Sequence, residues 1–158
     1  MLTEAINPTE HWGNVDRIVS RWLKDRQELI LIYCKVDGLK VFAQKDTPIQ
    51  VRVHALCEVL IDYVSAGHFE VYQQLIKEAE CFQDNYQATI DKLLPRIQES
   101  TEMALEFNDR YSDTELEQAD MDRLSKHLNK LGMKMVERFE LEDMLIDQLH
   151  TCHADKVA

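Results

Sequence analysis

The stretch Met121–His150 reads MDRLSKHLNKLGMKMVERFELEDMLIDQLH, and it decides the fold class. Its apolar residues recur every three or four positions, at Met121, Leu124, Leu128, Leu131, Met135, Phe139, Leu145, Ile146 and Leu149. This period places them on one face of a helix. Gly132 lies inside the pattern, which continues on both sides, so we expect either a break or a slight bend there.

This last helical region as a whole runs from Asp113 to His153. Three earlier segments repeat the helical period: Val15–Val36, Ile49–Ala66 followed by Gly67–Phe82, and Tyr86–Tyr111. For the first segment, whose apolar stripe includes Ile30, we expect Asn14 as the N-cap and Gly38 as the terminator.

The glycine and proline positions suggest interruptions in two of these segments. In the second segment Gly67 predicts a kink or break, with Ser65 ending one helix and capping the next. The helical period predicts that the apolar residues that follow point inward, and they are Phe69, Tyr72, Leu75, Ile76 and Ala79. For Phe69 an exposed aromatic side chain is the alternative. In the third segment Pro95 marks either a kink or the first turn of the helix.

These segments predict an all-α protein. The chain has 158 residues with only four glycines and three prolines, too few turn residues for a barrel or sandwich of short strands. No strand-like alternation, repeat or linker divides it. We therefore expect one domain over residues 1–158, folded as an antiparallel up-down four-helix-type bundle with a kinked or broken second helix.

The charge and cysteine content narrow the class of protein. With 29 acids against 18 bases the net charge is −11, which disfavours direct binding to DNA. Glu99–Asp122 holds nine of the acids and one base, which suits either a solvated surface or a basic protein partner. The four scattered cysteines, with Cys34 and Cys57 on apolar faces, indicate reduced core thiols and a cytoplasmic protein. The longest apolar run, Leu29–Cys34, is too short for a membrane span.

Three charged residues interrupt the apolar stripes: Arg26 in the first helix, and Arg138 and Glu142 in the last. Buried charges are tolerated when they are paired. We expect a partly buried polar network joining the two helices, with Arg26 bound to Glu142 or to Asp62. Such a network either fixes the helix register or forms a polar site.

The histidines offer an incomplete metal pattern. His54 and Glu58 are four residues apart, and His150 stands near His153 and Asp155, but Tyr86–Tyr111 contains no histidine to complete a bundle site. We therefore expect no metal and no cofactor, with a metal- or small-ligand-binding bundle as the alternative. A small enzyme built on Ser65 and His68 is a weaker rival, because nothing in the sequence supplies an oxyanion hole.

Several motifs carry a family resemblance. Arg21-Trp22-Leu23 with Arg26, then Gln27-Glu28-Leu29 and Tyr33, resembles the start of the Rsd/AlgQ family. The most specific match is Asp62–Tyr72, DYVSAGHFEVY, and a third is Glu137–Asp143, ERFELED, followed by Leu149-His150. His11-Trp12-Gly13 and Phe107-Asn108-Asp109 are closer to the AlgQ-type branch.

The resemblance implies an anti-sigma factor and not an enzyme. Members bind the primary, sigma-70 type sigma factor, chiefly its region 4, and compete with core RNA polymerase and promoter DNA. We expect the sigma-binding surface around Asp62–Tyr72 and the adjoining first helix. Asp62, Ser65 and Phe69 are spaced to share one helical face, beside the small Ala66. The candidate binding residues are Arg21, Trp22, Asp62, Ser65, His68, Phe69 and Tyr72.

Overall fold

The computed structural model describes residues 7–39 and 48–157, and these residues form helices and turns without a strand. The long helices are α1 (Pro8–Leu39), α2 (Ile49–Ala66), α3 (Tyr72–Cys81), α4 (Gln87–Tyr111) and α5 (Met121–Leu149). Shorter elements are the π-helical turn η1 (Gly67–Val71), the 3₁₀ turns η2 (Gln118–Asp120) and η3 (Thr151–His153), and α6 (Ala154–Val157). The all-α prediction is confirmed.

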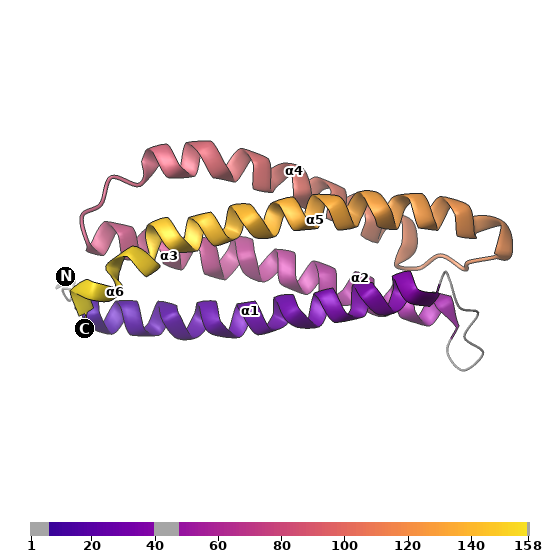
Figure 1. The fold of residues 1–158 in the computed structure, drawn as a ribbon, viewed down its shortest axis with the longest axis horizontal. Helices are drawn as coiled ribbons and strands as arrows, with labels where there is room; N and C mark the ends of the chain where they lie inside the picture. Colours follow the sequence, from indigo (N-terminus) through magenta and orange to yellow (C-terminus); the bar gives the residue numbers. More distant parts are fainter. Residues whose placement is uncertain (1–6, 40–47, 158) are drawn as a thin grey trace, which may run out of the picture.

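Four rods lie side by side (Figure 1). The first rod is α1, the second is α2 with η1 and α3, and α4 and α5 form the third and fourth. Following the colours, the chain runs along the bundle and back twice, so that α6 returns to the start of α1. No helix in the described ranges is both long enough and apolar enough to cross a membrane.

The first helix begins earlier than predicted. Pro8 occupies its first turn, where a missing N–H costs no hydrogen bond. Asn7 precedes it, and its Oδ1 accepts from the Thr9 N–H at 3.0 Å, so Asn7 takes the capping role expected of Asn14. Asn14 and Gly38 both lie inside α1, and neither bounds it.

The second rod is continuous, and its irregularity is a π turn and not a break. Gly67 has helical backbone angles, and Ser65 caps no helix. A Cβ at Gly67 would lie 3.1 Å from Tyr72 Oη and 3.2 Å from a ring carbon of Trp22. The glycine therefore permits close packing of α1, α2 and α3 at this point.

Pro95 and Gly132 also lie inside uninterrupted helices. Pro95 is within α4, so it does not start that helix. Gly132 does not end α5; a Cβ there would stand 2.8 Å from Tyr33 Cζ. Tyr33 Oη donates to the Leu128 carbonyl at 2.7 Å, and the bare Gly132 backbone leaves room for that contact.

The core combines buried apolar side chains from all four rods, among them Val19, Leu56, Leu60, Leu75, Leu93, Ile97, Leu128 and Leu145. The inward prediction is wrong for Ile30, which is exposed. Of the two alternatives for Phe69, a core residue or an exposed aromatic, the structure shows the second, because its side chain is 78% exposed. Cys34, expected in the core, is exposed too, whereas Cys57 is buried. Ile30 and Cys34 line an apolar groove of about 250 Å³ with Val136.

Candidate protein-binding site

The residues singled out in Asp62–Tyr72 fall into an exposed set and a buried set. Asp62 and Phe69 are exposed and Ser65 is partly buried. Their rod is continuous from α2 into η1, so Asp62 and Ser65 lie on the last turns of α2 and Phe69 lies in the π turn that follows. An exposed aromatic ring that follows a carboxylate and a hydroxyl along the same rod supplies an apolar anchor and polar groups for a partner.

The first helix flanks this surface through one exposed ion pair. Arg21 of α1 donates to Glu70 Oε1 of η1 at 2.8 Å, and both side chains are largely in solvent. The pair places Arg21 beside the π turn that carries Phe69. We define the candidate binding face as Arg21, Asp62, Ser65 and Phe69.

Trp22 and Tyr72 are both buried, so their side chains do not belong to the candidate binding face. Trp22 stacks on Tyr63 at a ring-centroid distance of 4.8 Å and meets Tyr72 edge-on at 6.0 Å. Its indole Nε1 donates to the Tyr63 carbonyl at 3.2 Å. These rings support the backbone around Gly67 and do not reach solvent.

Glu142 is the centre of a polar network below these aromatic residues. Its side chain is fully buried, and Oε1 accepts from Tyr63 Oη at 2.5 Å. Oε2 accepts from Arg138 Nε at 3.2 Å and from the Tyr72 hydroxyl. Burial raises the pKa of Glu142, while Arg138 and the two tyrosine hydroxyls act in the opposite direction.

Arg138 extends the network to α4 and back to η1. Its guanidinium donates to Ser100 Oγ at 3.1 Å and to Thr101 Oγ1 at 2.7 Å. Thr101 Oγ1 in turn lies 2.8 Å from His68 Nε2, one residue before the exposed Phe69. Burial and the Arg138 charge lower the pKa of His68. In the part of the chain that the structure describes, the hydrogen bond of His68 Nε2 is directed to Thr101 of α4 and not to Ser65.

Arg26 joins the network from α1. Its Nε donates to Tyr63 Oη at 3.0 Å, and its terminal nitrogens reach Asp143 at 2.6 Å and Glu142 at 3.5 Å. The guanidinium also lies over the Trp22 ring, 5.5 Å from its centroid. The structure thus brings Arg26, Arg138 and Glu142 together, and the carboxylates that bind Arg26 are Glu142 and Asp143. Asp62, the alternative partner, points to solvent.

A second buried cluster, which the sequence did not predict, lies just beyond the C-terminal end of α5. Glu78 of α3 is fully buried, with Oε1 2.5 Å from His150 Nδ1 and Oε2 2.7 Å from His153 Nδ1. His150 Nε2 lies 2.8 Å from Asp16 Oδ1, and His153 Nε2 contacts Asp84. Burial alone would lower the pKa of His150, but hydrogen bonds to Glu78 and Asp16 outweigh it and raise that pKa.

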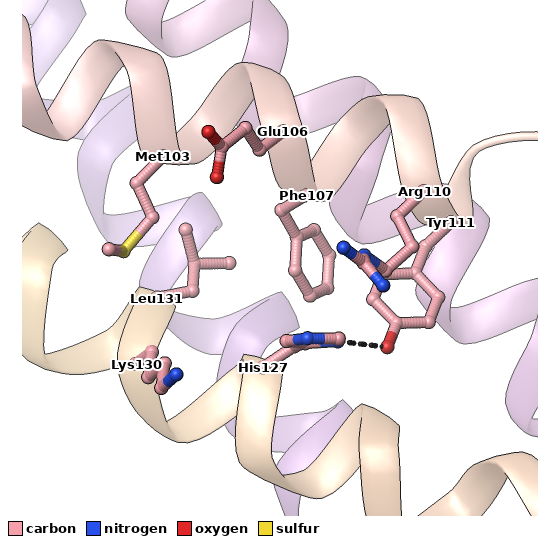
Figure 2. A pocket seen from close by; sticks show the side chains of 8 residues that line it. All are labelled: Met103, Glu106, Phe107, Arg110, Tyr111, His127, Lys130 and Leu131. Carbon is pink, nitrogen blue, oxygen red and sulfur yellow. Dashed lines mark hydrogen bonds between the residues drawn. The ribbon is translucent and has the colours of Figure 1, made fainter.

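A pocket of about 280 Å³ opens between α4 and α5, away from both clusters (Figure 2). Figure 2 shows its residues, with His127 hydrogen-bonded to Tyr111 across the two helices. The lining residues are Met103, Glu106, Phe107, Arg110, Tyr111, His127, Lys130 and Leu131. Burial, followed by the charges of Arg110 and Lys130, lowers the pKa of His127. The pocket is a small mixed hollow, and none of the sequence-predicted binding residues lines it.

Comparison with known proteins gives consistent matches over most of the chain. A family model described as "Regulator of RNA polymerase sigma(70) subunit, Rsd/AlgQ" matches residues 1–150. A "Regulator of sigma D" from Yersinia pseudotuberculosis serotype O:1b (strain IP 31758) is 33% identical over 147 residues, covering 92% of this chain and 87% of the relative. A protein of the same name from Enterobacter sp. (strain 638) is 31% identical over 166 residues, covering 100% of this chain and 98% of the relative. No solved structure shows a significant match.

Proposed function

The chain belongs to the Rsd/AlgQ family of regulators of the RNA polymerase sigma(70) subunit, and from this premise we propose that it is an anti-sigma factor that binds region 4 of the primary sigma factor. When it is bound to region 4, it competes with core RNA polymerase and with promoter DNA for that region of the sigma factor. The family is regulatory, and its members are described as regulators and not as enzymes.

The observation that carries the binding site is the 78% exposure of Phe69 on a π turn. A large aromatic side chain in water gains free energy when a partner covers it. π-Helical turns are rare and occur often at functional sites. Here the turn stands on Gly67, whose neighbours Trp22 and Tyr72 pack from below. The buried aromatic residues and the polar network hold the turn in place before any partner arrives.

The electrostatics suit a basic helical partner. A helix-turn-helix module that reads DNA carries Lys and Arg side chains for phosphate contacts. The net charge of −11 attracts such a module, and Asp62 supplies a carboxylate within the candidate binding face. When this protein covers the surface of region 4 that reads DNA, promoter DNA can no longer bind to that surface.

The test is binding of isolated sigma region 4 to Asp62→Ala and to Ser65→Arg, measured by calorimetry. Both positions reach solvent, so both variants should keep the wild-type unfolding midpoint while losing affinity. A matched control is Asp147→Ala, which removes an exposed acid on α5, outside the candidate binding face. Full binding by both variants would reject this face and move attention to the acidic stretch Glu99–Asp122.

A further inference from the structure

Three metal-ligating groups converge where the last turn of the chain meets the end of α3. They are the carboxylate of Asp84, the Sγ of Cys152 and a ring nitrogen of His153, and these ligand atoms lie within 4.8 Å of one another. Asp84 follows α3, whereas the other two residues belong to η3. Cys152 is exposed, Asp84 is partly exposed and His153 is buried, so the cluster opens to solvent on one side.

The ring of His153 is fixed from two directions. Its Nδ1 lies 2.7 Å from Oε2 of the fully buried Glu78, and its face stacks on Phe82 at a centroid distance of 4.1 Å and an angle of 6°. This leaves Nε2 aimed at Asp84. A histidine that donates one ring N–H to a carboxylate and presents the other nitrogen outward has the arrangement found around protein-bound zinc.

We propose that Asp84, Cys152 and His153 bind one zinc ion, with a water molecule as the fourth ligand on the open side. Thiolate, imidazole and carboxylate are all ligands that zinc accepts, and the mixed set suits zinc better than magnesium or calcium, which select oxygen. Tetrahedral coordination separates two ligand atoms by roughly 3.3 to 3.6 Å. The cluster therefore needs Asp84 to withdraw slightly from His153, a movement available to a partly exposed side chain.

The proton balance of binding is simple. Zinc replaces the proton that His153 Nε2 shares with Asp84, and the Cys152 thiol gives up the proton that it donates to the Gln148 carbonyl at 3.0 Å; both protons leave to solvent. Bound zinc would cross-link η3 to the residues that follow α3 and so fix the position of the C-terminal turn.

Within-helix spacing does not predict this site. The pairs considered from the sequence were His54 with Glu58 and His150 with His153 or Asp155, and they led us to expect no metal. Asp84 lies almost 70 positions before His153, and only the return of α5 to α3 joins them. The proposal is independent of sigma binding, since the candidate binding face shares no residue with the cluster.

The test uses the full untagged chain, stripped with a chelator and titrated with Co²⁺ under reducing, anaerobic conditions. One equivalent should produce the visible bands of tetrahedral cobalt and a near-ultraviolet thiolate-to-cobalt band, and Zn²⁺ should bleach both. Cys152→Ser should lose the thiolate band, and Asp84→Asn should weaken Co²⁺ binding at least tenfold. Cys34→Ser, which removes an exposed thiol outside the cluster, should behave as wild type.

Circular dichroism of each variant separates loss of a ligand from loss of the fold, because Cys152 and Asp84 both reach solvent. Absence of a stoichiometric thiolate band in the wild-type protein would overturn the proposal. So would retention of that band in Cys152→Ser, or its loss in Cys34→Ser.

Discussion

Arg138 and Glu142, four residues apart on α5, form an ion pair in which both side chains are fully buried. Burial of this pair is tolerated because both groups have further hydrogen-bond partners. Tyr63, Tyr72 and Arg26 also donate to Glu142. Ser100 and Thr101 accept from Arg138. Desolvation of such a pair offsets much of its attraction, so its main effect is on uniqueness of packing. All four rods contribute to it, which ties their register together.

Removal of one member of this pair should be costly. Glu142→Gln leaves Arg138 buried without a counter-charge, and we expect the free energy of unfolding to fall by about 3 kcal/mol. Urea unfolding followed by circular dichroism measures the change. The control is Glu137→Gln, which breaks exposed ion pairs with Arg96 and Lys134 and should leave the midpoint in place. Equal midpoints for Glu142→Gln and wild type would mean that water reaches the network.

Two of the helical glycines, Gly132 and Gly13, should respond in opposite ways to replacement by alanine. A Cβ at Gly132 would press on the Tyr33 ring, whose hydroxyl holds the Leu128 carbonyl, so Gly132→Ala should lower stability by about 1 to 3 kcal/mol. A Cβ at Gly13 meets nothing within 4 Å, so Gly13→Ala should raise stability by about 1 kcal/mol through helix propensity. Thermal unfolding of both variants gives the comparison. A stabilised Gly132→Ala would show that Tyr33 moves aside freely.

Helical periodicity predicted the four rods because each buries a stripe of apolar residues, and the stripe is written locally in the sequence. The exposure of Phe69 has a physical cause. An inward Phe69 ring follows from the ordinary period of an α-helix. Phe69 lies in η1, and a π turn rotates less per residue than an α-helix does, so the ring points elsewhere. The low helix propensity of glycine predicts a kink at Gly67, but the structure shows that Gly67 allows Trp22 and Tyr72 to pack closely against the backbone. Propensity alone carries no information about such a contact.

The polar clusters also contain residues that the local sequence predicts and residues that depend on tertiary contacts. Arg26, Arg138 and Glu142 were visible because a charge inside an apolar stripe demands a partner. Thr101 gave no signal, since a hydroxyl on a helix is ordinary in either environment. Glu78 gave none either, because its partners His150 and His153 come 72 and 75 positions later in the sequence and meet it only through the bundle topology.

His150 should make stability fall as the pH rises above neutrality. Its pKa is raised in the folded protein by Glu78 and Asp16, against burial, while an unfolded histidine titrates near about 6.5. The folded state therefore holds the proton more tightly, so its contribution is complete below about pH 6.5 and is lost as the pH passes through the folded pKa. Urea midpoints between pH 6.5 and 8.5 should decline in wild type.

A His150→Gln variant is the control for this slope. It removes the titrating group, so its midpoint should change less across that range, whatever its absolute stability. The window avoids the region below about pH 6.5, where the lowered pKa values of His68 and His127 act in the opposite sense. A wild-type midpoint that stays level from pH 6.5 to 8.5 would contradict the assignment of a stabilising protonated His150.

Phe69 should act in binding and not in folding. Its ring is 78% exposed, so Phe69→Ser removes little buried surface and should leave the unfolding midpoint unchanged. If region 4 covers the ring, the same variant should bind at least tenfold more weakly, as expected for an aromatic anchor at the centre of an interface. Met133 on α5 is a matched control, because it is an apolar side chain with 77% exposure outside the candidate binding face. Met133→Ser should therefore bind as wild type does. Equal losses in the two variants would indicate a general dependence on surface apolarity, and undiminished binding by Phe69→Ser would place the contact elsewhere on the bundle.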